Sequence, residues 1–294
     1  MITNATVRTF APEWWGQVDI FQNFYGGTHS FSTDGKKAVL GVKNHFQKAL
    51  TLRDVAIKML PNLAIDEDEL NTKGYTSANN SKEFSAVIEE VFTELYSSID
   101  CTRKIITSIY KRTRRLKDST RKMFHSVKTD QLGSDFPNEL KDAIISADWF
   151  EELLAIRDEL THSDIGNCHK NQETGAISYS HYGLKINGSP LIIEDVLKRS
   201  SELIDGVNNL LGNVFNYLNS NLEKTNINQL CGVFFGRAYM RTLPFEIPID
   251  FNSGTCLSRN WFDNESAYKC PFATSCKAYQ RAEPTPPITA YQIT

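Results

Sequence analysis

The sequence lacks several features that would assign the chain to a special class of protein. No apolar run approaches the length of about 20 residues that a membrane-spanning helix needs. The first residues are polar and interrupted by Pro12, so they do not resemble a secretory signal. The net charge of −3 excludes a surface that is basic throughout, and it limits any contact with nucleic acid to a local patch. We therefore expect a soluble, cytoplasmic protein that does not contact a membrane.

Cysteine is also scarce. Six cysteines are spread over 294 residues, which is unlike the dense disulfide framework of a small secreted domain. Four of them, Cys231, Cys256, Cys270 and Cys276, fall in the C-terminal part of the chain, and a structural zinc site uses four such thiolates. Their spacing argues against zinc, because paired ligands usually stand two to four residues apart. We expect reduced cysteines and no cofactor, and a zinc-stabilised nucleic-acid adaptor stays open as a weaker alternative.

The chain does contain enough apolar material for a full core, since 40% of its residues are hydrophobic. Periodicity and composition predict a mainly α fold, with a helical bundle, an inserted β-hairpin and a small mixed appendage. The three expected parts are an irregular, aromatic-rich N-terminal arm at 1–35, the bundle at 36–224 and the appendage at 225–294. A Pro-rich tail begins at Glu283.

Apolar residues recur at helical spacing in four stretches of the bundle outside its motif helix. These stretches are 36–60, 81–116, 138–147 and 193–224. Between the first two we expect a polar loop at 61–81, because a proline ends the first helix and four adjacent acids, Asp66 to Glu69, follow. Ser81 is the expected N-cap of the long second helix.

A β excursion interrupts the helices at 176–193. The Asn187-Gly188 pair predicts the tight turn of a small hairpin. Tyr179, His181 and Tyr182 on this hairpin could reach a nearby cleft, although an exposed hairpin with mixed aromatic residues needs no function.

The most informative helix is predicted at 149–166, with the sequence WFEELLAIRDELTHSDIG. At about 100° per residue, its core side is formed by Trp149, Leu153, Ile156 and Leu160. Asp158 and His162, four residues apart, project together from the opposite side, and Arg157 lies at the edge of the apolar arc. An arginine, a carboxylate and a histidine therefore gather at a helix end, where Gly166 is the expected C-cap.

Arg157, Asp158 and His162 resemble the signature of the HEPN family. In that signature an arginine is followed directly by a polar residue, and four to six residues separate the arginine from a histidine further along the chain. Many HEPN proteins are metal-independent ribonucleases whose helical bundles dimerise, so that two copies of the motif meet in one cleft. The resemblance implies an endoribonuclease that acts as a homodimer, with a role in a toxin–antitoxin pair or in antiviral defence and a partner protein that inhibits or activates it.

Two alternatives stay open. Related bundles without nuclease activity bind a partner protein or a nucleotide. His162 also has a purely local explanation, as a surface residue favoured by the negative end of the helix dipole.

The implied reaction is attack of a ribose 2′-oxygen on the neighbouring phosphate. It needs a base for the hydroxyl proton, a cation for the charge of the phosphorane and an acid for the leaving oxygen. A histidine can serve as base or acid near neutral pH, because its ordinary pKa is about 6.5. In the implied site His162 carries the proton, Asp158 holds its ring, and Arg157 grips the phosphate with forked donors.

A single helix does not bring Arg157 and His162 together. Five residues correspond to about 140° around the helix axis. Either the final turn unwinds near Gly166, or a two-fold dimer places His162 of one copy beside Arg157 of the other. The resemblance favours the dimer.

A run of cations precedes the motif helix in this otherwise acidic chain. The residues from Tyr110 to Lys128 include almost no acids, and Tyr110, Phe124 and His125 offer rings among the charges. The candidate RNA-binding residues are Lys111, Arg112, Arg114, Arg115, Arg121 and Lys122. Such a concentration can neutralise several phosphates. A solvated helix end, stabilised by the helix dipole, is the alternative.

Overall fold

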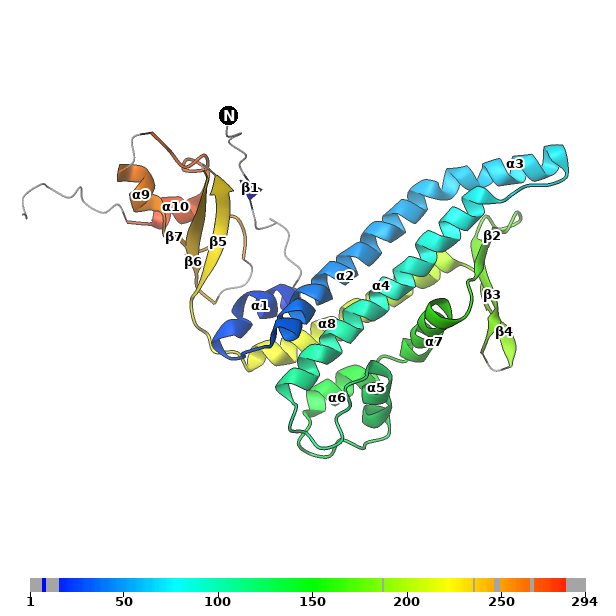
Figure 1. Ribbon diagram of the computed structural model, residues 1–294, viewed down its shortest axis with the longest axis horizontal. Helices are drawn as coiled ribbons and strands as arrows, with labels where there is room; N and C mark the ends of the chain where they lie inside the picture. Colours follow the sequence, from blue (N-terminus) through cyan, green and yellow to red (C-terminus); the bar gives the residue numbers. More distant parts are fainter. Residues whose placement is uncertain are drawn as a thin grey trace, which may run out of the picture. The chain divides into compact units, whose positions relative to one another are not determined.

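The computed structural model shows a mainly α-helical protein, as predicted (Figure 1). It describes residues 7–8, 16–186, 188–234, 236–245, 249–264 and 267–283. The chain divides into two compact units. The helical unit is Ser30–Leu218, and the terminal unit combines Met1–His29 with Asn219–Thr294. Within the described ranges, none of the helices combines the length and the hydropathy that crossing a membrane requires.

Two long helices form the centre of the helical unit. Helix α2 (Thr33–Met59) and helix α4 (Asn79–Ile109) run side by side in opposite directions (Figure 1). The apolar residues of α4 that are at most 1% exposed are Phe84, Ile88, Val91, Phe92, Leu95, Ile99, Ile105 and Ile106. They recur every three or four residues and so share one face, and burying each large side chain contributes roughly 1.5–3 kcal/mol.

Helix α8 (Val196–Ser220) completes this core. Its residues Val196, Leu203, Val207, Leu211 and Val214 are at most 1% exposed. Arg53 of α2 donates a hydrogen bond from Nη2 to Ser201 Oγ of α8 over 2.8 Å. The helices predicted at 36–60 and 193–224 are therefore confirmed, with ends that differ by a few residues.

The loop predicted at 61–81 is wrong for most of its length. A 3-10 turn, η2 (Leu60–Asn62), leads directly into helix α3 (Leu63–Lys73). Pro61 is tolerated because the first turn of a helix does not use its N–H groups. Asp66 of α3 is buried and accepts hydrogen bonds from Ser81 N at 2.7 Å and Ser81 Oγ at 2.8 Å. The start of α4 is thus capped by a carboxylate from α3 and not by Ser81 itself.

The long helix ends at Ile109, seven residues before the predicted end at Leu116. Leu116 is the only aliphatic residue between Ile109 and Thr120, so no apolar face holds a continued helix against the core. Residues 110–119 instead form turns, with Thr113 N donating to Tyr110 O over 2.8 Å. We call residues 110–119 the turn segment.

Three shorter helices follow the turn segment. They are α5 (Thr120–Lys128), α6 (Asn138–Ile145) and the motif helix α7 (Phe150–His162). Stacked rings join two of them to α4: Phe150 of α7 lies 3.6 Å from Phe124 of α5 and 6.3 Å from Tyr96 of α4, measured between ring centroids. The motif helix is therefore fixed against both α4 and α5.

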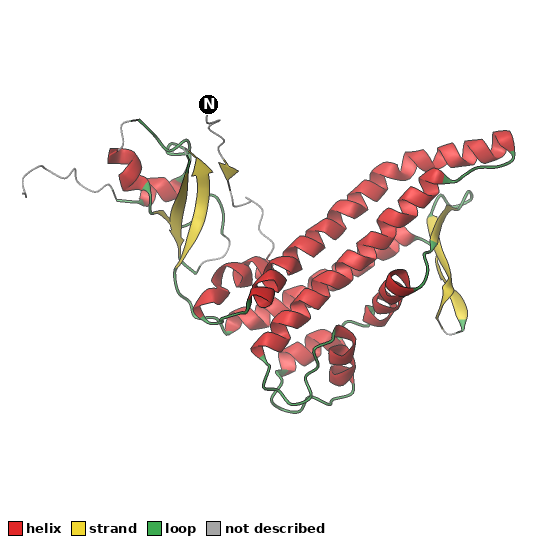
Figure 2. Ribbon diagram, in the orientation of Figure 1, coloured by secondary structure: helices red, strands yellow, loops and turns green. Residues whose placement is uncertain are grey.

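A small antiparallel sheet follows α7. Its strands are β2 (Asn167–Lys170), β3 (Ile177–Ile186) and β4 (Ser189–Ile193), in that order (Figure 2). The predicted hairpin is confirmed as β3 and β4, although Asn187 at its turn lies outside the described residues. Strand β2 lies before the β excursion predicted at 176–193. Its Cys168 pairs with Tyr179 of β3, and both side chains are at most 2% exposed, so β2 covers an apolar face.

The terminal unit is built around a second antiparallel sheet. Strands β1 (Val7–Arg8), β5 (Ile227–Phe234), β6 (Arg237–Leu243) and β7 (Thr255–Cys256) lie in that order (Figure 2). The other elements of this unit are α1 (Gly16–Phe24), η1 (Tyr25–Gly27), α9 (Arg259–Asn264) and α10 (Lys277–Arg281). A core on this sheet consists of Tyr239, Phe262, Cys276, Ala278 and Tyr279. The arm residues before Gly16, other than Val7 and Arg8, and the Pro-rich tail after Glu283 lie outside the described residues.

Candidate functional site

The motif helix α7 presents its arginine from a partly buried position beside α4. Phe150, Leu153, Leu154 and Ile156 of α7 are buried. This confirms Leu153 and Ile156 of the predicted core side, whereas Trp149 and Leu160 are only partly covered. The guanidinium of Arg157 lies over the Tyr96 ring, 4.8 Å from its centroid. A stacked arginine keeps its forked donors in one plane and loses little freedom on binding an anion.

Asp158 joins two arginines. Its Oδ1 accepts a hydrogen bond from Arg157 Nη1 over 3.0 Å, and its Oδ2 forms an ion pair with Arg121 of α5. The Asp158 side chain is 27% exposed, so solvent screens these charges only in part. In the described part of the chain, no hydrogen bond links Asp158 to His162. The carboxylate thus orients arginines within one copy of the chain, and the predicted contact with the histidine ring is not formed there.

His162 is the last residue of α7, and it is exposed. Ser163 N still donates to Glu159 O over 2.9 Å, so the final turn stays helical. The separation of about 140° between Arg157 and His162 therefore remains, and the unwinding considered from the sequence does not occur. The C-cap is Ser163, not the predicted Gly166.

Buried polar contacts fix the chain where it leaves the motif helix. Glu89 of α4 accepts a hydrogen bond from Gly166 N at 2.6 Å and another from Tyr179 Oη at 3.0 Å. Burial raises the pKa of Glu89, although these two hydrogen bonds act in the opposite direction. Gly166 is required here, because a Cβ at this position would lie 2.3 Å from the Tyr179 ring.

The ring of His181 also holds the segment that follows α7, through contacts with two backbone groups. Its Nε2 lies 3.1 Å from Asp164 O, and its Nδ1 accepts a hydrogen bond from Leu184 N at 3.0 Å. A carbonyl can only accept and a backbone N–H can only donate, so the network assigns the proton of a neutral ring to Nε2. Tyr179 and His181, which could have reached a cleft, instead support the end of α7, while Tyr182 is exposed.

The candidate RNA-binding residues divide into three groups. Arg112, Arg114 and Arg115 are exposed on the turn segment, where Arg115 has a left-handed φ of 67°. Arg121 and Lys122 lie on α5 and line a pocket of about 450 Å³. Lys111 lines a different pocket.

The pocket at α5 is bordered by the motif helix itself. Its lining residues are Lys117, Arg121, Lys122, His125, Ser126, Gln131 and Glu151. Three cations and a histidine thus face one carboxylate, Glu151, which belongs to α7 and also forms an ion pair with Lys128 over 3.3 Å. Because Arg121 both lines this pocket and pairs with Asp158, the pocket is continuous with the Arg157–Asp158 pair. We call this region the α5–α7 pocket.

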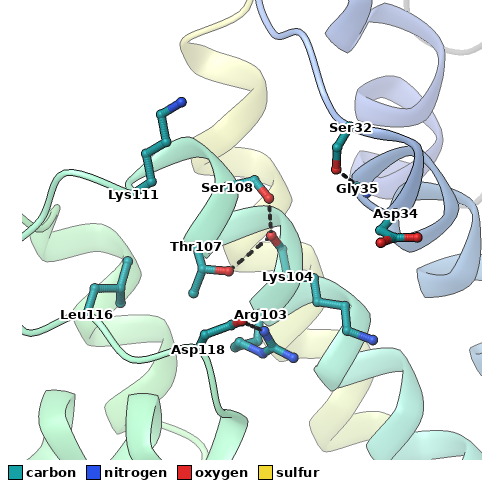
Figure 3. A pocket seen from close by; sticks show the side chains of 10 residues that line it. All are labelled: Ser32, Asp34, Gly35, Arg103, Lys104, Thr107, Ser108, Lys111, Leu116 and Asp118. Carbon is teal, nitrogen blue, oxygen red and sulfur yellow. Dashed lines mark hydrogen bonds and ion pairs between the residues drawn. The ribbon is translucent and has the colours of Figure 1, made fainter.

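The second pocket has about 520 Å³ and lies at the other side of the turn segment (Figure 3). Its lining residues are Ser32, Asp34, Gly35, Arg103, Lys104, Thr107, Ser108, Lys111, Leu116 and Asp118. Its cations are largely neutralised: Arg103 forms ion pairs with Asp118 and Asp100, and Lys104 Nζ lies 3.1 Å from Asp100 Oδ2. A strongly anionic ligand is therefore better served by the α5–α7 pocket.

Asp100 connects the two regions. It accepts a hydrogen bond from Thr120 Oγ1 over 2.6 Å, and Thr120 also hydrogen-bonds to Tyr96, the ring beneath Arg157. Burial raises the pKa of Tyr96, although that hydrogen bond and the charge of Arg157 act in the opposite direction. This contact was not predictable from the sequence, because nothing local distinguishes Asp100 from other acids of α4.

Comparisons with known proteins add no relative to this geometry. No protein-family model, no curated protein and no solved structure matches the chain. Function must therefore be inferred from the residues themselves.

Proposed function

We propose that the helical unit is a metal-independent endoribonuclease of the HEPN type. It cuts RNA by attack of the 2′-oxygen in a cleft between two copies of the chain, in the cytoplasm, as a toxin or antiviral effector that a partner protein restrains or activates. The observation that carries the proposal is the bridge from Arg157 through Asp158 to Arg121. It joins the motif to the α5–α7 pocket, so that Arg157 and two of the candidate RNA-binding residues, Arg121 and Lys122, form one surface.

The charges of this surface suit a phosphodiester. Lys117, Arg121 and Lys122 give the α5–α7 pocket three cations against one carboxylate. Pockets of about 300–1,000 Å³ accept small ligands, so its volume of about 450 Å³ has room for part of a nucleotide. Binding by these cations releases counterions and weakens with salt.

The exposed ring of His162 supports a composite site. Arg157 and His162 remain on different sides of one continuous helix, so a single copy does not aim both at one phosphate. A two-fold axis close to α7 would place each His162 beside the Arg157 of the other copy. In that arrangement His162 transfers the proton, Arg157 stabilises the phosphorane charge, and Asp158 holds Arg157 in position.

The direct test is RNA cleavage in the presence of a chelator. His162→Ala should reduce the cleavage rate by at least the factor of about 10² that a general acid or base contributes. Arg157→Ala should also lose activity, whereas His169→Ala, which removes another exposed histidine, should cleave like the wild type. Equal rates for His162→Ala and the wild type on structured and unstructured RNAs would refute the proposal.

Mixing two inactive variants tests whether the site is shared between copies. If Arg157→Ala and His162→Ala chains exchange at random, half of the dimers are mixed and each holds one complete pair. About a quarter of the wild-type activity should then return. Dimers that exchange, as shown by light scattering and a tagged chain, without any recovery would mean that both residues act within one copy.

A non-catalytic module that binds a partner protein is the second candidate. Large apolar side chains are more than a third exposed on α2 and α3, namely Leu40, Leu50, Val55, Ile57, Ile65 and Leu70. Exposed apolar surface is typical of an interaction site. This function becomes the better explanation if neither the wild type nor the variants cleave RNA while the wild type is properly folded.

A further inference from the structure

Three cysteines that are far apart in the sequence belong to one small core in the terminal unit, and a fourth lies on strand β5 of its sheet. Cys256 of β7 and Cys270 pack against the core cluster that contains Cys276. Cys231 lies on β5 at the point where the strand's register with β6 shifts, between Leu230 and Gly232. Strand β6 runs between β5 and β7, and its Arg241 is the partner of Cys256. The sheet therefore brings these cysteines closer together than their spacing in the sequence indicated.

The four thiols lie close enough to influence one another. No disulfide joins them. The thiol of Cys270 interacts electrostatically with those of Cys231, Cys256 and Cys276, and burial together with this proximity raises its pKa to about 11.

Backbone donors already point at two of the sulfur atoms. Cys256 receives hydrogen bonds from the N–H groups of Ser258 and Arg259, two and three residues later, and Cys270 receives one from Phe272. Hydrogen bonds of this kind stabilise a sulfur that carries negative charge, and in metal sites they orient the ligand. A thiol in an ordinary apolar core has no need of them.

We propose that Cys231, Cys256, Cys270 and Cys276 form a structural zinc site that stabilises the terminal unit. Four cysteine thiolates form the closed, tetrahedral type of zinc site, with Zn–S distances of about 2.3 Å. Zn²⁺ takes the place of four thiol protons, which pass to the solvent, so that the site carries a net charge of −2.

Binding requires the side chains to adjust. Among the described residues, no group of three or more His, Cys, Asp or Glu side chains could hold a metal ion as it stands. A cysteine side chain has a single torsion between backbone and sulfur, so its sulfur can turn between three staggered positions while the backbone stays in place. A small core such as this one is also the kind that a metal most often completes, because it buries little apolar surface.

The test is metal analysis of the full-length protein produced in zinc-supplemented cells and purified under reducing conditions. We expect one zinc per chain, and X-ray absorption should show a shell of sulfur atoms only, at about 2.3 Å. Cys270→Ser and Cys276→Ser should lose the metal, whereas Cys101→Ser, which changes a buried cysteine of the helical unit, should retain it.

Three outcomes would overturn the proposal. They are a reduced wild-type protein that neither contains zinc nor takes up zinc or cobalt, zinc with nitrogen or oxygen in its ligand shell, and a full zinc content in Cys270→Ser. The first two use only the wild type, so they decide the matter even if the cysteine variants misfold. None of them depends on whether the helical unit cleaves RNA.

Discussion

Replacing Asp100 with asparagine should destabilise the helical unit at neutral pH but not in acid. Asp100 is the acid that ties α5 to α4 beneath the motif helix. Burial acts to raise its pKa, but hydrogen bonds from Thr120, Arg103 and Lys104 outweigh burial and lower the pKa from 3.8 to about 2. Its side chain is 28% exposed, so solvent screening reduces these interactions only moderately.

The size of the effect follows from proton linkage. A pKa lowered on folding favours the native state wherever the carboxyl is ionised, so the stabilisation is present above the unfolded pKa near 4 and is lost as the pH falls towards 2. A shift of nearly two units corresponds to roughly 2 kcal/mol of unfolding free energy at pH 7, at about 1.4 kcal/mol per unit. About half of this should remain at pH 3 and little at pH 2.

The assay is urea unfolding followed by far-UV circular dichroism, whose helical signal comes mainly from the helical unit. Asp100→Asn should be less stable than the wild type by roughly 2 kcal/mol at pH 7, and the difference should shrink steadily below pH 4. Asp54→Asn, an exposed acid of α2, should change little at any pH. A difference that is the same at pH 7 and pH 3 would refute the electrostatic argument and leave only the altered hydrogen-bond geometry.

Two further changes test the packing and the charge around the motif helix. Gly166→Ala should lower stability by about 1–3 kcal/mol in thermal unfolding, because the new methyl group meets a buried tyrosine ring; Gly212→Ala, where nothing lies within 4 Å of the new atom, should stabilise α8 by up to about 1 kcal/mol. Equal effects of the two would contradict the proposed close approach. Arg121→Ala should weaken RNA binding and reduce the slope of log K against log salt by about 1, whereas Lys82→Ala at the start of α4 should leave both unchanged.

Helices with a repeated apolar face were predictable from the sequence, because burial of that face decides their conformation. The core residues Phe84, Ile88 and Val91 signal α4 without any knowledge of its neighbours. Glu89 lies among them and looks like a solvent-facing acid. Its burial depends on Gly166 and Tyr179, which are 77 and 90 residues away in the sequence, so no local pattern could have shown it.

In the motif, the spacing of residues along the helix predicts the wrong partner for Asp158. A pair of side chains at positions i and i+4 on a helix contributes about 0.2–0.5 kcal/mol, whereas a charge-assisted hydrogen bond contributes about 1.5–3 kcal/mol. Asp158 therefore turns to Arg121, 37 residues earlier in the chain, and not to His162 on the next turn. The sequence identified the three residues of the motif, but only the packing of α5 against α7 determines the partner of the carboxylate.

That choice of partner bears on the proposed site between two copies of the chain. Arg157, Arg121 and Asp158 together carry a net charge of +1, which matches the single negative charge of a phosphodiester. Without Asp158 the two arginines would repel each other and would not be held in one orientation. Arg157 is thus held in position within one copy of the chain. Among the described residues, no carboxylate orients the ring of His162, which is exposed at the end of the same helix. In the proposed mechanism, a phosphate bound at Arg157 needs a proton carrier, and the exposed His162 of a second copy is the group that fills this role.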